Sequence, residues 1–494
     1  MFKNIKFQII LALVFSMLFW SCSEDLGNYD YVDINQVEFE GIASNYTALF
    51  GEPFEIIPTL NYTKDGSADE SRYSYEWVAY NETALQADQK WPLATTKNLQ
   101  LEALTVPPND YNVRYLVTDV ETGVQWSTSF KLNVESTISE GWMVLNDVNG
   151  VARLDMVSKV AGEYSPIYDV LDYANSSLTL EGAPVNVYCY AYDPQFYGIY
   201  VTTEGTGTTK IEPDTFDWKV EYYLSFEMLS DVPTDFGADF IERTGGNESV
   251  MYKDGNFYYY VRVYQYRYGV PINIVDGEVE PFKAAPFVGA VGQFRGANLY
   301  YDVEERRFLR QSWGAQKCNV MPEGTLFDYN TGKDLLFMDG TSYNGGEVFA
   351  ILKEPGLEKL FLARMSSGIF GRINQVYYEE IPAEIAADMA QADHFAVSPQ
   401  FGYVFYNVGG KIYEYDFGLK QTKLMIDRGD EEVTVLKFQK LSPYSNSLLL
   451  ATHGAGASSG KMSLYEVAPV NGDLVPLESY DGFGKIVSIS YRDQ

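Results

Sequence analysis

HFAVSPQFGYVFYNVGGKIYEYDF, residues His394–Phe417, is the stretch that shows most clearly how this chain folds. Two apolar and aromatic runs flank a loop that contains Pro399, and a third run follows the turn at Gly409-Gly410. Valine, tyrosine and phenylalanine favour β-strands, and glycine pairs favour tight turns. The segment therefore predicts an antiparallel sheet of at least three short strands.

The same pattern recurs along the C-terminal part of the chain. Ser447–Val467 repeats it, and Asn298–Arg310 and Gly324–Asp339 repeat it less completely. Units that recur at a spacing of roughly 40–65 residues are typical of propeller blades. The candidate units begin near Trp142, Val185, Phe240, Phe287, Gly324, His394 and Val433.

These units predict a β-propeller of about seven blades over residues 141–494, and the pattern leaves six or eight blades open. Blades pack both faces against their neighbours, so their strands are apolar and aromatic throughout. We expect the last run, Lys485–Tyr491 (KIVSISY), to complete the first blade and close the ring. The helical pattern Ala383–Ala392 is expected as an insertion on one face.

The composition indicates an exported all-β protein. Of the 494 residues, 46% are hydrophobic and 15% aromatic, which is enough for a large core. The formal net charge of −32 repels phosphate backbones and argues against nucleic-acid binding. Besides Cys22, the chain has Cys189 and Cys318, which either pair in an oxidising compartment or pack as small buried side chains.

Residues 37–135 predict a separate β-sandwich, because they hold several short strands and one tryptophan, Trp77, that suits its core. Turn sequences separate these strands, and Lys64–Glu70 is interpreted as an acidic turn because it lacks the complete calcium-loop pattern. Residues 136–140 are the expected linker to the propeller. The predicted strands are Phe54–Ile56, Tyr73–Tyr80, Tyr111–Val117 and Trp126–Val134.

The N-terminus predicts export and a lipid anchor. Lys3 and Lys6 precede the apolar run Ile9–Phe19, which has the length of a signal peptide and is too short to span a bilayer, since spanning takes about 20 residues. Cys22 follows the small residue Ser21 where cleavage is expected. This arrangement resembles the signal of bacterial lipoproteins, in which the cysteine becomes the acylated N-terminus.

The resemblance implies a signal peptide over residues 1–21, acyl chains such as palmitate on Cys22, and a lipidated tether over residues 22–36. The next residues, Ser23-Glu24-Asp25, resemble the export tag of Bacteroidota lipoproteins that are displayed on the cell surface. We therefore expect attachment to the outer membrane, facing the cell exterior. A periplasmic orientation is the alternative.

The sandwich resembles a PKD domain. The residues that carry the resemblance are Gly51–Phe54 (GEPF), Tyr75–Trp77 (YEW), Tyr111, Val117-Thr118-Asp119, Gly123 and Val134. Together with the preceding SCSEDLGNYDYVDIN, this N-terminal third of the chain resembles the PKD-like family of Bacteroidota lipoproteins. Members commonly accompany an outer-membrane transporter pair of the SusC/SusD type. The resemblance implies nutrient capture beside such a TonB-dependent importer, and the residues do not choose between oligopeptide and oligosaccharide ligands.

Motifs of known enzymes are missing or stand in the wrong context. The chain has two histidines, His394 and His453, and neither an HExxH nor a CxxC pair. The G-x-S-x-G at Gly456–Gly460 precedes an expected strand, whereas a nucleophile elbow precedes a helix. We expect a non-catalytic protein without metal or cofactor. The alternatives are a propeller-type surface hydrolase or lyase and a purely structural subunit.

One aromatic stretch, Phe257–Tyr268 (FYYYVRVYQYRY), is the candidate ligand-binding surface. If it is one continuous strand, every second side chain lies on the same face. Tyrosine and arginine are enriched in recognition surfaces, and core packing is the alternative. The six residues on that face are Tyr258, Tyr260, Arg262, Tyr264, Tyr266 and Tyr268.

Overall fold

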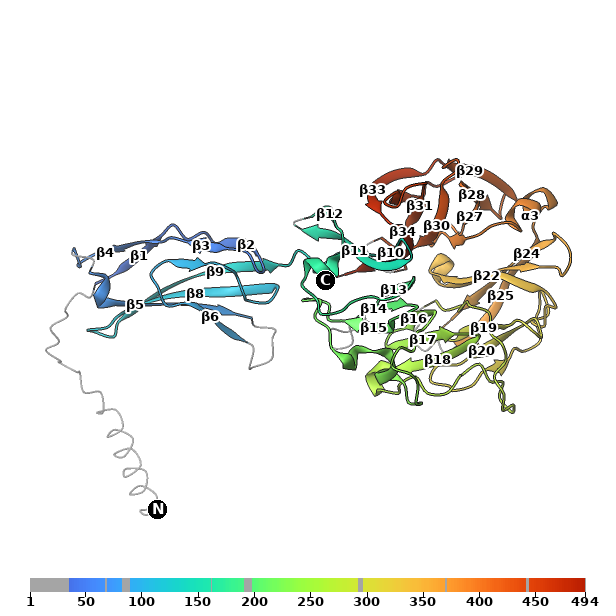
Figure 1. Ribbon diagram of the computed structural model, residues 1–494, viewed down its shortest axis with the longest axis horizontal. Helices are drawn as coiled ribbons and strands as arrows, with labels where there is room; N and C mark the ends of the chain where they lie inside the picture. The colour runs from blue at the N-terminus through green and yellow to red at the C-terminus, as the bar shows by residue number, and fades with distance from the viewer. Residues whose placement is uncertain are drawn as a thin grey trace, which may run out of the picture. The chain divides into compact units, whose positions relative to one another are not determined.

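The computed structural model describes residues 35–493 except 67–68, 82–88, 161, 191–197, 292–295, 369–370 and 441–443. The chain divides into two compact units, Met1–Val134 and Glu135–Gln494, and the regular structure of their described residues is mostly β-strand with a few short helices (Figure 1). The predicted signal peptide and Cys22 lie outside the described residues. Within the described part, none of the helices has the length and apolar character needed to cross a membrane.

The first unit is a sandwich of antiparallel pairs. One sheet has five strands in the order β2-β9-β8-β5-β6, and two further pairs, β1-β4 and β3-β7, complete it. The strands are β1 Val37–Glu40, β2 Asn45–Leu49, β3 Phe54–Ile56, β4 Thr59–Tyr62, β5 Tyr73–Tyr80, β6 Lys90–Ala94, β7 Leu99–Leu101, β8 Asn109–Asp119 and β9 Gln125–Glu135. The four predicted strands of this unit are therefore confirmed.

Trp77 on β5 is fully buried at the centre of the sandwich, as predicted. Its ring stacks on Tyr115 with the centroids 3.8 Å apart, and its indole N–H donates to the carbonyl of Thr96 at 2.9 Å. Burial is tolerated because the one polar atom of the ring has a partner. The tryptophan therefore joins the large sheet to the loop that precedes β7.

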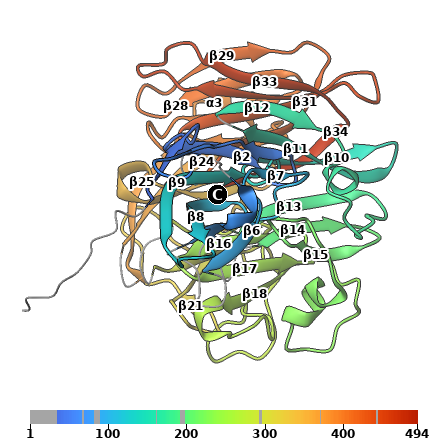
Figure 2. The same cartoon turned by 90° about the vertical axis from the view of Figure 1, so that its left-hand side faces the viewer.

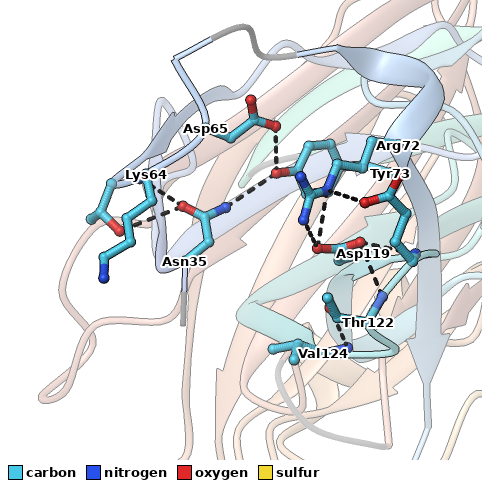
Figure 3. A network of polar contacts seen from close by, with 10 residues as sticks. Asn35, Lys64, Asp65, Arg72, Tyr73, Asp119, Thr122 and Val124 are labelled. Atoms are coloured by element: carbon cyan, nitrogen blue, oxygen red, sulfur yellow. Dashed lines mark hydrogen bonds and ion pairs between the residues drawn. The ribbon is translucent and has the colours of Figure 1, made fainter. Parts of the chain in front are cut away.

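Polar side chains hold together the loops at one end of this sandwich (Figure 3). Arg72 donates to Asp119 at 2.7 and 3.1 Å. The Tyr73 hydroxyl donates to Asp65 at 2.9 Å and accepts from the amide of Asn35 at 3.1 Å. Asp65, from the predicted acidic turn, thus has a structural partner, and the described residues contain no cluster of three or more His, Cys, Asp or Glu side chains placed to hold a metal.

The second unit has seven sheets among its described residues, numbered here as blades 1 to 7. Blade 1 is β34 Lys485–Arg492, β10 Gly141–Val148, β11 Val151–Val160 and β12 Glu163–Ile167. Blade 2 is β13 Pro184–Tyr190, β14 Gly198–Thr203 and β15 Gly207–Ile211, and blade 3 is β16 Phe240–Gly245, β17 Glu248–Lys253 and β18 Asn256–Val261. Blade 4 is β19 Asn298–Asp302, β20 Arg307–Gln311 and β21 Asn319–Val320.

The later blades have four strands each. Blade 5 is β22 Asp334–Thr341, β23 Glu347–Lys353, β24 Leu360–Ser367 and β25 Ile373–Glu380. Blade 6 is β26 Phe395–Val397, β27 Val404–Val408, β28 Lys411–Asp416 and β29 Gln421–Asp427. Blade 7 is β30 Glu432–Phe438, β31 Ser447–His453, β32 Gly460–Glu466 and β33 Val475–Phe483. Short helices are α2 Val170–Tyr173 and α3 Ala383–Met389, with 3-10 turns at Glu70–Arg72, Val220–Tyr222, Leu224–Glu227, Arg262–Tyr264 and Tyr343–Gly345.

Apolar clusters join each blade to the next and show that the blades form a ring. For example, Ile199 of blade 2 and Met143 of blade 1 share one cluster, and Leu449 of blade 7 and Ile489 of blade 1 share another. Five further clusters join blades 2 and 3, 3 and 4, 4 and 5, 5 and 6, and 6 and 7. The predicted β-propeller is therefore confirmed, with seven blades.

The last strand closes this ring, as predicted. β34 pairs antiparallel with β10, from Gly141 opposite Arg492 to Asp147 opposite Lys485. Both views show the two strands side by side (Figures 1 and 2). β34 is the innermost strand of blade 1 and also contacts β13 of blade 2 and β30 of blade 7. The two ends of the unit thus build one blade together.

Two predicted blade boundaries need correction or refinement. The unit expected near Gly324 begins ten residues later, because its first strand, β22, starts at Asp334. The unit expected near Phe287 has its first regular strand at Asn298, but residues 284–289 form isolated bridges to that strand, between Ala284 and Asp302 and between Gly289 and Leu299. An irregular inner strand therefore precedes β19, because Pro286 lacks the N–H needed for a regular ladder.

Removing residues 485–494 is expected to destroy the cooperative unfolding of the propeller. Blade 1 would lose its inner strand, and Ile486, Ile489 and Tyr491 would be lost from the cluster with blade 7. Thermal unfolding followed by circular dichroism tests this. A control chain that lacks only Asp493 and Gln494 keeps β34 whole and should melt like the intact protein. A cooperative transition at the normal temperature in the shorter chain would contradict the closure.

Candidate functional site

A cavity lies on the axis of the propeller, where the inner strands of the blades converge. Its volume is about 570 Å³. Its lining comes from β34, β13, β16, β22, β26, β30 or the residues that directly follow them, and from the irregular segment of blade 4 at 286–291. All seven blades thus contribute to one cavity. Small-molecule sites commonly have volumes of roughly 300–1,000 Å³, so this channel has the size of a ligand site.

A lysine bridges two carboxylates across the channel. The ammonium of Lys440, which follows β30, lies 2.7 Å from Asp339 of blade 5 and also pairs with Glu242 of blade 3. Burial opposes the charge of Lys440, but the two carboxylates outweigh it and hold its pKa well above the usual range. The side chain keeps 42% of its surface exposed, toward the cavity that it lines. Three blades are therefore linked by one cation.

A second lysine, Lys437 on β30, has a different environment. Its ammonium donates to the backbone carbonyl of Ile489 on β34. Burial lowers its pKa to about 8, with a smaller contribution from the positive charge of Lys440, while Cys189 and Glu242 act in the opposite direction. No carboxylate of the described residues forms an ion pair with it. Lys437 is thus a cation whose hydrogen-bond acceptor, the Ile489 carbonyl, is neutral.

The wall beside Lys437 is formed by short polar side chains. The Ser490 hydroxyl accepts from the backbone N–H of Cys189 at 2.9 Å. The Ser488 hydroxyl donates to the side-chain carbonyl of Asn186 at 3.1 Å. All four residues line the cavity, from blades 1 and 2.

Aromatic rings form another part of the wall. Phe287, Phe337 and Phe395 come from blades 4, 5 and 6, and neighbouring centroids are 5.9 and 5.4 Å apart. The cavity therefore combines an apolar, aromatic side with a charged and polar side. Such a wall suits a ligand that has both a flat apolar surface and polar groups.

Sequence reasoning missed these channel residues. Glu242, Asp339 and Lys440 follow one another at intervals of about a hundred residues, and each stands alone in a predicted strand or loop. One signal was present. Innermost strands line the axis of a propeller, so charged residues near the start of each repeat unit, such as Glu242 just after Phe240, are candidates for the channel.

The prediction that Phe257–Tyr268 is one strand with six side chains on one face is wrong. β18 ends at Val261, a 3-10 turn covers Arg262–Tyr264, and Gln265 has a left-handed φ of 51°. The chain folds back, and Val261 bridges to Tyr266. The six side chains therefore point in different directions.

Three of the six predicted residues lie in the core, because Arg262 finds a buried partner. Its guanidinium lies 3.3 Å from Glu227 and donates to the Tyr200 hydroxyl at 2.7 Å. The Tyr260 ring lies against it, with 4.2 Å from the guanidinium carbon to the centroid, and Tyr268 is fully buried beside it. A buried charge needs an opposite charge and hydrogen-bond partners. The turn that brings the Arg262 guanidinium to these partners also ends β18.

The other three residues differ in exposure. Tyr258 is half-buried against the cluster between blades 2 and 3. Tyr264 and Tyr266 are 58% and 63% exposed, and their rings lie 5.7 Å apart. These two rings are the part of the predicted surface that faces solvent.

The histidines and cysteines have structural neighbours. His394 lies 3.2 Å from the carbonyl of Val433, and His453 ends β31. Cys189 and Cys318 are both buried and free, so they do not pair. Burial raises the pKa of the Cys189 thiol to about 12, which leaves it protonated and unreactive at neutral pH.

Comparison with known proteins identifies the N-terminal part of the chain. Residues 22–184 match the PKD-like family. The match covers the sandwich and continues through β10, β11 and β12 of blade 1, so the PKD-like region spans the start of the propeller. A search of curated proteins gave no match.

Several solved structures are similar to this chain at low identity and low TM-score. A quinoprotein alcohol dehydrogenase-like protein from Bacteroides thetaiotaomicron is 11% identical, with a TM-score of 0.46 over 93% of this chain and 99% of that chain. A DUF4784 family protein from Bacteroides caccae is 10% identical, with a TM-score of 0.31 over 92% and 98%. The β-propeller domain of Cps50 (Swd1) from Myceliophteria thermophila is 9% identical, with a TM-score of 0.38 over 65% and 94%.

One perturbed carboxyl lies outside the channel lining. Glu414 on β28 is 2% exposed, and neither of its oxygens accepts a hydrogen bond in the described part of the chain. Burial raises its pKa to about 7, while Lys423 on β29 acts in the opposite direction. Because a buried carboxylate is costly without a partner, the fold favours the protonated form.

Replacing this carboxyl by an amide, Glu414→Gln, should stabilise the protein at alkaline pH. The folded pKa of about 7 lies above the ordinary glutamate pKa of 4.5, so the stability linked to the protonated form is complete below about pH 4.5 and lost as the pH rises through about 7. Glutamine does not ionise. We expect the variant to gain about 2 kcal/mol in unfolding free energy relative to the natural chain between about pH 5 and pH 8.

Urea unfolding at both pH values measures this difference. Glu466→Gln changes an exposed glutamate of blade 7 and should show no such trend. Parallel pH profiles for the natural chain and Glu414→Gln would contradict the burial argument.

Proposed function

We propose that this protein is a lipid-anchored outer-membrane lipoprotein, exposed on the cell surface, that captures nutrients beside a SusC/SusD-type TonB-dependent importer. The ligand is an oligopeptide or an oligosaccharide, and the protein catalyses no reaction on it. The observation that carries the proposal is the channel of about 570 Å³, in which side chains from all seven blades converge. A rigid ring with one mixed apolar and polar cavity is suited to binding.

The N-terminal sequence supports the anchored part of the proposal. The PKD-like match begins at Cys22, the residue expected to carry the lipid. The preceding residues have the positive start and apolar run of a signal peptide. A sandwich between the lipid and the propeller acts as a spacer in the chain.

The state of the channel acids supports a non-catalytic role. Glu242 and Asp339 both pair with Lys440. A general acid or base must exchange a proton with a substrate, and a carboxylate held by an ammonium is a weak base. Binding without chemistry therefore fits these groups better than hydrolysis or elimination.

The anchor and the partner are tested together in the native host. A tag on the C-terminus of the full chain should co-purify a SusC-type transporter and its SusD-type lipoprotein from outer membranes in mild detergent, in comparable amounts by mass spectrometry. Cys22→Ala should release the protein from the membrane fraction, because the acyl chains have no other attachment point. Cys318→Ala, which changes a buried cysteine, should leave it there. Purification of the protein alone would refute the partnership.

The solvent-facing tyrosines test where ligand is held. Neither ring lines the channel, so Tyr264→Ala combined with Tyr266→Ala should leave capture of peptides or glycans by the purified complex unchanged if the channel holds the ligand. Weaker capture would place part of the ligand on these rings. The melting temperature should not change, because both rings are largely exposed. Tyr173→Ala removes a similarly exposed tyrosine from α2 and serves as the control. Unchanged capture by the double variant would remove these residues from the binding surface.

A further inference from the structure

The proposed function places the ligand in the channel. On that basis, we propose that the channel binds the carboxylate group of the ligand, and that Lys437 supplies the positive charge that holds this group. The ligand is thus a small acid, either a sugar acid or a peptide with a free C-terminus. Both sources present the same singly charged, planar group.

The charge of the channel differs from that of the whole chain. The chain has 68 Asp and Glu residues and 36 Lys and Arg residues. The cavity lining contains three basic residues, Arg243, Lys437 and Lys440, and two acidic ones, Glu242 and Asp339. A positive surplus inside a strongly acidic protein concentrates anions at that place, because the rest of the surface repels them.

Lys440 and its two carboxylates carry one negative charge overall, so the positive surplus of the lining comes from Arg243 and Lys437 together. Lys440 already has Glu242 and Asp339 as partners. Lys437 donates to the neutral carbonyl of Ile489, and an ammonium has three donor positions. Within the described residues its charge has no ion-pair partner, and a buried charge without one is costly. A ligand carboxylate would remove that cost.

Further hydrogen-bond donors stand on the same wall. Ser490 uses its oxygen to accept from Cys189, so its hydroxyl proton remains to be donated. Asn186 accepts from Ser488 through its carbonyl, which leaves its amide group as a donor. Both side chains line the cavity with Lys437. A group of donors suits a ligand atom that only accepts, and an ionised carboxylate is such an acceptor.

The single charge also favours a carboxylate over a phosphate. Three basic and two acidic side chains leave the lining with one positive charge, which balances one negative charge on a ligand, whereas a phosphate monoester carries almost two near neutral pH. The aromatic side of the cavity, with Phe337 and Phe395, gives the remainder of the ligand an apolar surface. Sugar rings and peptide side chains both pack on such rings.

The protonation of Lys437 gives the site a pH limit. The groups around its ammonium are Cys189 on β13, Glu242 on β16, Lys440 after β30 and the Ile489 carbonyl on β34. Burial lowers its pKa to about 8, so the charge is present at neutral pH and is lost as the pH rises above about 8. Carboxylate affinity should fall over the same range, by about tenfold for each pH unit.

Two pairs of probes that differ only in the carboxylate test the proposal by titration calorimetry on the detergent-solubilised full chain. One pair is methyl galacturonide and methyl galactoside, and the other is the dipeptide Ala-Phe and its C-terminal amide. We expect the acid of at least one pair to bind at least about tenfold more tightly than its neutral partner. The pair that binds distinguishes the sugar source from the peptide source.

The variant Lys437→Met, which keeps the side-chain length and removes the charge, should abolish this preference. Lys423→Met removes a lysine of β29 in blade 6 that pairs with the exposed Asp473 of blade 7, and this variant should keep the preference. If Lys437→Met does not fold, the pH profile of the natural chain decides, because affinity must fall above about pH 8.

Equal binding of acid and neutral probes, or a preference that survives in Lys437→Met, would overturn the proposal. So would the absence of binding by all four probes up to about 10 mM. Recovery of the transporter pair with the tagged protein is independent of these results, so failure of the carboxylate site and failure of the importer partnership are distinguishable.

Discussion

The pairing of β34 with β10 is the interaction on which the rest of the propeller depends. Each blade stacks on two neighbours, and no blade is stable without the apolar clusters on its two faces. The first blade obtains its inner strand from the far end of the chain, through the register of Gly141 with Arg492. Without it, the cluster between blades 7 and 1 would lose Ile486 and Ile489. One antiparallel pair therefore converts a row of sheets into a ring.

The candidate site depends on the same closure. The carbonyl of Ile489, which binds Lys437, and the hydroxyls of Ser488 and Ser490 all belong to β34. The cross-channel bridge of Lys440 needs blades 3, 5 and 7 at fixed positions around the axis. Such a bridge brings charges into an enclosed space, where an unbalanced charge has a large effect. The same inner strands thus stabilise the ring and line the candidate binding cavity.

Local pattern predicted the four strands named in the sandwich because strand formation there follows from alternation and turn residues. Tyr73–Tyr80 is β5 as predicted, and Trp77 is fully buried in the core of the sandwich. The same rule failed after Val261. There a long-range partner, Glu227, holds Arg262 inside the molecule, and period-two alternation along the sequence carries no information about such a partner.

The sequence by itself determined the all-β class, the sandwich, the repeated blade pattern and the strand that closes the ring, because turn chemistry and apolar periodicity act over a few residues and repeat along the chain. The blade count of seven needed the tertiary structure. It also placed the predicted lipid anchor at Cys22. Only the tertiary structure decided the channel. The ring brings together four charged side chains: Glu242, Asp339, Lys437 and Lys440. Charges interact across space, and the spacing of residues in the sequence does not show which blades face one another.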